Sequence, residues 1–304
     1  MSPMSEVTDP VASARILDRG YRRYLGRRRG VRGAVRTVAL HSIQRALGLR
    51  RSAWAKVLPI GFVLLAYVPA IVYIGLVSLL PETTTNDGPS IQDVILPTYG
   101  EYLGYVSLLV ALLVAFVAPE ILCTDRRTGM VGLYLASPLT RDTYLVAKAI
   151  ATAAVLALIT IGPTLLMLVA FIIQGEGPDG PWNVFLTALR IVGSGLVITA
   201  IYTGLSMGVS SLTDRKAFAT VGLILLFFLS NVVTGVLTEG LGLNENLIVL
   251  NIFAFPLALV QRFHGEGEHF QEVGVAAVTV AAIGWTIVWA ALCRFRYQHL
   301  TVTK

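Results

Sequence analysis

Two histidines and two carboxylates stand close together in the C-terminal third of the chain, at His264, Glu266, Glu268 and His269. Imidazole and carboxylate groups are ligands that transition metals accept. However, Gly265 and Gly267 separate these side chains, and their spacing matches no strong metal motif. We therefore favour a solvated acidic loop here over a metal site.

Other residues that could carry chemistry form no known catalytic pattern. The sequence contains no G-x-x-x-x-G-K-[ST] phosphate loop, no H-E-x-x-H, no C-x-x-C and no G-x-S-x-G. We expect no cofactor on this chain and no enzyme activity of its own. A membrane-embedded enzyme or a scaffold would need a catalytic cluster or a long docking domain, and neither is evident.

The composition indicates the elements that must position any site. Of the 304 residues, 55% are hydrophobic and 14% are charged, and the mean hydropathy is +0.71. Soluble domains carry about 25% charge, so a membrane protein is indicated. Six apolar runs are long enough to cross a bilayer as helices. They are Leu58–Leu80, Tyr102–Leu122, Ile150–Ile173, Ile191–Leu212, Ala217–Leu237 and Val273–Cys293.

These runs predict an all-α membrane protein with one transmembrane domain over about residues 57–296. A seventh apolar stretch, residues 247–260, contains Pro256 and is too short to span. We interpret it as a short re-entrant or interfacial segment before the last helix. The alternating pattern of a membrane β-barrel is absent.

The charges predict the orientation of the spans. Of the 24 basic residues, 22 fall in the two terminal segments or in the loops that follow the second and fourth spans. Basic residues favour the cytoplasmic side of a membrane. We therefore predict a multi-pass protein of the cell membrane with both termini cytoplasmic.

The N-terminal segment is the most basic part of the chain. We predict a disordered tail over residues 1–33 and an amphipathic helix over residues 34–56, with Arg45 on its polar face. A basic amphipathic helix lies in the membrane interface, where anionic lipid attracts it. This placement explains the charge without nucleic acid, which we do not expect as a partner. Residues 297–304 form a cytoplasmic tail.

The spans hold few ionisable residues, which argues against a proton- or ion-coupled carrier or a channel. That class remains the alternative to the transporter described below. Some mid-span polar side chains could pack helices together or line a conduit: Ser107, Thr203, Ser206 and Asn231. Gly204 and Gly208 form a GxxxG pattern that serves either packing within one subunit or contact between two subunits.

The loop between the second and third spans is the most informative stretch. Residues 128–137 form a short amphipathic segment that Pro138 ends. The segment displays Met130, Leu133 and Tyr134 between charged flanks. A short apolar helix of this kind suits docking into a groove of a soluble partner.

This loop resembles that of the ABC-2 type permeases, the membrane subunits of one class of ATP-binding-cassette exporters. Their loop reads acidic-basic-x-x-G-T-L-E-x-L-L-x-x-P, then Ser/Thr-Arg and a later Lys. Gly132 stands where the family has Glu. Met130, Val131 and Tyr134 also depart from the pattern. The residues in register are Asp125, Arg126, Gly129, Leu133, Leu135, Pro138, Thr140, Arg141 and Lys148.

The resemblance implies a function that the composition alone does not give. In that family, the helix at residues 128–137 is a coupling helix that inserts into an ATPase subunit, which binds ATP and Mg. Two permease subunits, identical or different, would form the transporter, and the first, second and fifth spans would line the path. The resemblance implies export of a hydrophobic or amphiphilic solute, such as a drug, lipid or peptide. The coupling residues it implies are Asp125, Arg126, Gly129, Met130, Leu133, Tyr134, Leu135, Pro138, Arg141 and Lys148.

Overall fold

The computed structural model describes residues 30–49, 53–79, 97–265 and 274–300. These residues form helices and connecting turns and contain no strand, which confirms the predicted all-α fold. In chain order the elements are α1 (Gly30–Ala46), α2 (Ala53–Leu79), α4 (Tyr99–Arg127), α5 (Met130–Leu135), α6 (Arg141–Thr160), α7 (Gly162–Gln174), α8 (Gly180–Ser211), α9 (Lys216–Gly235), the π-helical turn η1 (Val236–Gly240), the 3₁₀ helix η2 (Glu245–Leu250), α10 (Phe255–His264) and α11 (Val275–Gln298).

Six helical segments within the described residues are long and apolar enough to cross a membrane, which confirms the six predicted spans. Each overlaps one of the predicted apolar runs, and several extend past it by a polar turn or more. The segments are Lys56–Leu79, Tyr99–Arg127, Arg141–Gln174, Gly180–Ser211, Lys216–Gly240 and Val275–Gln298.

The third span is broken into α6 and α7, a break that the sequence analysis did not predict. Pro163 lacks the N–H that would continue the helix ladder at the break. The hydroxyl of Tyr67 fills the space beside Gly162 and leaves no room for a Cβ atom there. That hydroxyl donates a hydrogen bond to the Leu158 carbonyl, at 3.1 Å. Glycine at 162 therefore lets α2 approach the break closely.

The N-terminal helix differs in extent from the predicted residues 34–56. α1 begins at Gly30 and ends at Ala46, and the next helix, α2, begins at Ala53. Gly48 adopts a φ of +70°, a left-handed conformation that ends helices and that side chains disfavour. Residues 30–33 of the predicted disordered tail are therefore helical, and the rest of that prediction, residues 1–29, lies outside the described part of the chain, as do residues 301–304 of the C-terminal tail.

The stretch predicted to be re-entrant forms two short helices, η2 and α10, instead of one segment. The chain turns between them because the Asn251 side-chain oxygen accepts hydrogen bonds from the amides of Phe253 and Ala254, at 3.1 and 3.0 Å. α10 packs against α4, α8 and α11. Neither short helix is long enough to cross a bilayer.

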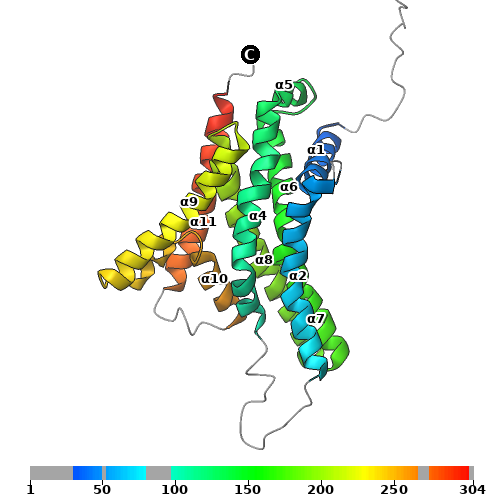
Figure 1. Ribbon diagram of the computed structural model, residues 1–304, viewed down its shortest axis with the longest axis vertical. Coiled ribbons are helices and arrows are strands. Elements are labelled where there is room, and N and C mark those ends of the chain that lie inside the picture. The colour runs from blue at the N-terminus through cyan, green and yellow to red at the C-terminus, as the bar shows by residue number, and fades with distance from the viewer. Residues whose placement is uncertain (1–29, 50–52, 80–96, 266–273, 301–304) are drawn as a thin grey trace, which may run out of the picture.

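Two helices, α4 and α8, form the centre of the bundle. α4 contacts α2, α6, α9 and α10, and it starts at a capping box in which Thr98 and Glu101 bond each other's backbone amides. α2 lies beside α7, whereas α9 diverges from the bundle axis (Figure 1). α1, α5 and the C-terminal end of α11 lie at one end of the bundle, which we call the α5 end (Figure 1).

Candidate functional site

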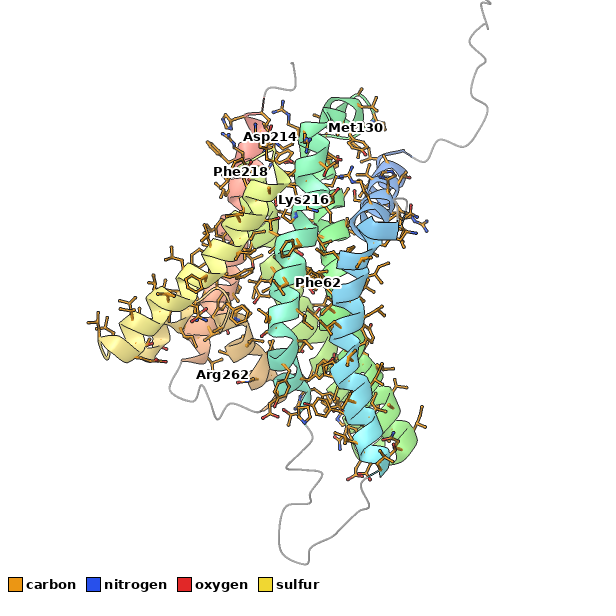
Figure 2. All side chains as sticks on the ribbon, viewed as in Figure 1. Phe62, Met130, Asp214, Lys216, Phe218 and Arg262 are labelled. Atoms are coloured by element: carbon orange, nitrogen blue, oxygen red, sulfur yellow. The ribbon has the colours of Figure 1, made fainter. Side chains whose placement is uncertain are left out.

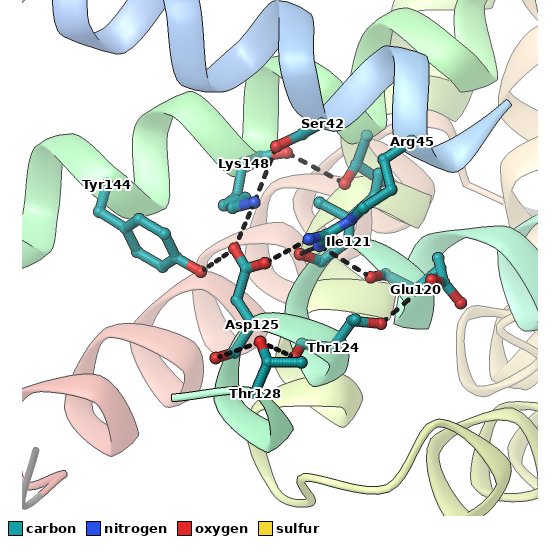
Figure 3. A network of polar contacts seen from close by, with 10 residues as sticks. Ser42, Arg45, Glu120, Ile121, Thr124, Asp125, Thr128, Tyr144 and Lys148 are labelled. Atoms are coloured by element: carbon teal, nitrogen blue, oxygen red, sulfur yellow. Dashed lines mark hydrogen bonds and ion pairs between the residues drawn. The ribbon is translucent and has the colours of Figure 1, made fainter. Parts of the chain in front are cut away.

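A buried carboxylate organises the α5 end. Asp125, in the last turn of α4, has no exposed surface. Its Oδ1 lies 2.6 Å from an Arg45 guanidinium nitrogen on α1, and its Oδ2 lies 2.6 Å from the Lys148 Nζ on α6 (Figure 3). The carboxylate therefore ties α4 and α6 to α1, which is distant from both in the sequence.

Neighbouring polar groups complete this cluster, which we call the Asp125 cluster: Asp125, Arg45, Lys148, Ser42 and Tyr144. The Tyr144 hydroxyl donates to Asp125 at 2.9 Å, and Lys148 donates to the Ser42 hydroxyl at 2.7 Å (Figure 3). The second Arg45 nitrogen donates to two carbonyls of α4, each at 3.3 Å. Buried charges persist only when they are paired and hydrogen-bonded in this way.

The two arginines of the motif bind the ends of other helices. Arg126 donates to the carbonyls of Ser211 and Thr213, at 2.6 and 3.0 Å, just where α8 ends. Arg141 donates to carbonyls at the end of α11, including that of Leu300 at 3.2 Å. The last carbonyls of a helix have no partner within it and carry partial negative charge, so a guanidinium satisfies them well.

The short helix α5 stands on this base. It begins after Gly129, whose φ is +70°, so a side chain there would be strained although there is open space for it. Tyr134 anchors α5, because its ring lies 5.8 Å from the Tyr144 ring and 5.6 Å from the Lys148 Nζ. Burial, and next the charge of Asp125, raise the pKa of Tyr134, which keeps the phenol neutral.

The outer face of α5 is apolar and exposed. Leu133 is 65% exposed and Met130 is 36% exposed, and no residue of α5 is buried. The structure thus divides the residues expected to couple. Asp125 and Lys148 are buried in contacts within the chain, Arg126 and Arg141 hold helix ends, Leu135 is half-buried, and Gly129, Met130, Leu133 and Pro138 are exposed.

Sequence reasoning missed part of the Asp125 cluster. Ser42 and Tyr144 were not singled out, and Arg45 was expected to face away from the protein. The spacing on α1 does contain a signal, because Ser42 and Arg45 are three residues apart and share a helix face with buried Val38. Without a known partner, that polar edge is indistinguishable from one that faces solvent.

The mid-span polar residues separate into two groups. Ser107, Thr203 and Ser206 are buried inside the bundle, and the Ser206 hydroxyl bonds back to the Thr203 carbonyl at 3.1 Å. Asn231 is instead exposed on α9. An exposed amide on a membrane helix needs a polar partner, because lipid tails offer none.

The GxxxG pattern on α8 faces another helix of the same chain. A Cβ on Gly208 would lie 2.7 Å from the Trp289 ring of α11, and one on Gly204 would lie 3.4 Å from the Thr286 carbonyl. Both glycines are buried. Close packing of α8 on α11 therefore accounts for the pattern, and this face is covered without a second subunit.

The histidine and carboxylate group considered for metal binding lies mostly outside the described residues, which include only His264 of the four. No set of three or more His, Cys, Asp or Glu side chains in the described ranges could hold a metal ion. His264 pairs with the Ser194 hydroxyl at 3.2 Å. Burial, and next the charge of Arg190, lower the pKa of His264 to about 4, so the imidazole is neutral near pH 7.

Comparison with known proteins supplies one match. The model of a family described as "ABC-2 family transporter protein" matches residues 31–300, nearly the whole described chain. No curated protein matches the chain significantly.

Proposed function

The chain belongs to the ABC-2 family of transporter proteins, and from this premise we propose that it exports a small hydrophobic or amphiphilic solute across the cell membrane. As a permease of that family it is a membrane subunit and not itself an enzyme. ATP, with Mg, is hydrolysed on a separate ATPase subunit, and a second permease, identical or different, completes the transporter.

The exposed apolar face of α5 is the observation that carries this proposal. Met130 and Leu133 project from a short helix whose base is fixed by buried charges. Such a helix can insert into a groove of the ATPase as a rigid body. Closure of two ATPase subunits on ATP would then move α5, and with it α4 and α6, because a ligand shifts an equilibrium by its differential affinity for two states.

The sidedness of the charges supports the orientation that this mechanism requires. α5 follows a basic loop, and α1 and the end of α11 lie beside it with the basic residues Arg32, Arg36, Arg294 and Arg296. We therefore propose that the α5 end is cytoplasmic, with both termini there. An ion- or proton-coupled carrier or channel is the second candidate, and it would need no ATPase.

Copurification with the ATPase subunit tests the proposal. The full chain, purified in mild detergent, should bring with it a stoichiometric ATPase that contains a Walker-type phosphate loop. Leu133→Asp should lower that copurification about tenfold or more, because a buried leucine contributes about 1.5–3 kcal/mol to an interface. Leu49→Asp is the control, since Leu49 is 51% exposed at the same end but outside the loop.

Two results would contradict the proposal in different ways. Undiminished ATPase binding by Leu133→Asp would remove the coupling role of α5. A purified homo-oligomer that conducts ions and carries no ATPase would favour the channel instead.

A further inference from the structure

A groove opens between the α5 end of α4 and the start of α9. Its volume is about 920 Å³, and its walls are Phe116 and Arg127 of α4 together with residues 214–217, Thr220 and Val221 of the facing segment. Figure 2 labels two of the lining residues, Asp214 and Lys216, and they lie towards the α5 end of the bundle. α9 contacts only part of α4, because it diverges from the bundle axis (Figure 1).

The mouth of the groove is predominantly basic. Arg127, Arg215 and Lys216 are exposed there, against one exposed acid, Asp214. Lys216 pairs with Glu120 at 3.0 Å, and its side chain remains 45% exposed. Since this pair is partly solvated, Lys216 can exchange Glu120 for another anion at small cost.

The interior of the groove is apolar. Along the axis of α4, Phe116 lies about 16 Å from Arg127 and about 6 Å from Glu120, the partner of Lys216. Phe116 in turn packs on Phe62 of α2, with 6.2 Å between ring centroids. Together with Ala217 and Val221 of α9, Phe116 gives the groove an apolar wall beside its cations.

We propose that this groove takes up an amphiphile with an acidic headgroup from the cytoplasmic leaflet. The headgroup binds Arg127, Arg215 and Lys216, and the acyl chain lies along α4 towards Phe116. Charge complementarity selects the headgroup, because a cationic amphiphile would face three positive side chains. The assignment rests on the proposed function, since it names the class of solute that the exporter takes from the membrane.

Photocrosslinking of lipid to the full chain tests this assignment without ATP or an ATPase subunit. The chain is placed in phosphatidylcholine nanodiscs that contain a trace of phosphatidic acid or phosphatidylcholine with a photoactivatable acyl chain. Phosphatidic acid should label the peptides that contain Phe116 and Val221 more strongly than phosphatidylcholine does. Arg127→Gln with Arg215→Gln should lower that labelling about fivefold for each cation removed.

A matched variant separates the groove from a general attraction of anionic lipid to basic surface. Arg32→Gln with Arg36→Gln removes two exposed cations from α1 at the same end of the bundle and should leave labelling at Phe116 and Val221 unchanged. Equal labelling by both lipids, or an equal loss in the α1 variant, would overturn the proposal. Because no nucleotide is present, failure here leaves the ATPase-dependent function to be judged by the Leu133 variant.

Discussion

The two flanks of α4 at the α5 end are built in opposite ways. On one flank, α4 meets α1 and α6 through the Asp125 cluster, in which Asp125 and Lys148 are fully buried, and α1 packs on α6 through Val38 and Ala147. On the other flank, α4 packs on α9, a groove opens where α9 begins, and the partly exposed Lys216–Glu120 pair lies beside that groove. The same helix therefore has one closed and one open side.

This contrast assigns different tasks to the two sides. A buried charge cluster has one good geometry, because any displacement leaves a charge unpaired in a low dielectric. The closed flank is thus suited to carry motion from α5 into α4 and α6 without loss. A partly solvated pair over a groove has many geometries of similar energy, so the open flank is suited to separate and admit a solute.

The largest expected effect comes from removing the central carboxylate of the closed flank. Asp125→Asn should lower the free energy of unfolding by about 3–5 kcal/mol, because the buried Lys148 and the partly buried Arg45 would lose their counter-charge. Denaturation of the purified chain in mixed micelles measures this loss. The comparison is Asp142→Asn, which breaks the exposed pair Arg294–Asp142, whose side chains are 62% and 52% exposed. If Asp125→Asn costs no more than this, the Asp125 cluster does not hold the closed flank rigid.

A second variant of the closed flank asks whether α1 belongs to it. Ser42→Ala removes the hydroxyl that Lys148 bonds and should cost about 1–3 kcal/mol of unfolding free energy, since Lys148 is fully buried. Ser78→Ala is the control, because the exposed Ser78 hydroxyl bonds only the nearby Gly75 carbonyl, at 2.8 Å. If both variants lose an equal, small amount of unfolding free energy, the contact of α1 with Lys148 does not stabilise the closed flank.

The sequence allowed the spans to be predicted because six long apolar runs are a strong signal. The observed helices extend past several of these runs into polar residues, and this does not obscure the runs. The break at Gly162 was not predicted although Pro163 signals it, because the stretch stays apolar on both sides. The approach of Tyr67 from α2, which requires the glycine, is visible only in the structure. The C-terminal end of α1 was also predicted wrongly. The amphipathic pattern continues for ten residues beyond Ala46, but Gly48 has a positive φ and the helix ends before it.

The candidate site was predictable only in part, for a related reason. Asp125 and Lys148 could be selected because they follow a family pattern within one loop, but their partner Arg45 is distant in sequence. Amphipathic spacing distinguishes the polar face of a helix from its apolar face, but it does not show whether the polar face contacts solvent or a buried carboxylate. The family resemblance implied that the second and fifth spans line a path, but the shape of the groove between α4 and α9 was not predictable, since it depends on the angle at which α9 leaves α4.

The smallest expected effect is the one that defines the open flank. Lys216→Met should change the free energy of unfolding by at most about 1 kcal/mol, because the pair with Glu120 is partly exposed and water replaces it readily. The identical substitution Lys148→Met provides the matched comparison, and it should cost more, since it leaves Tyr144 and Arg45 alone to hold Asp125. Denaturation in mixed micelles compares the two variants under one condition. If Lys216→Met lowers the unfolding free energy as much as Lys148→Met does, the Lys216–Glu120 pair holds α9 firmly to α4. The two helices would then have to move together.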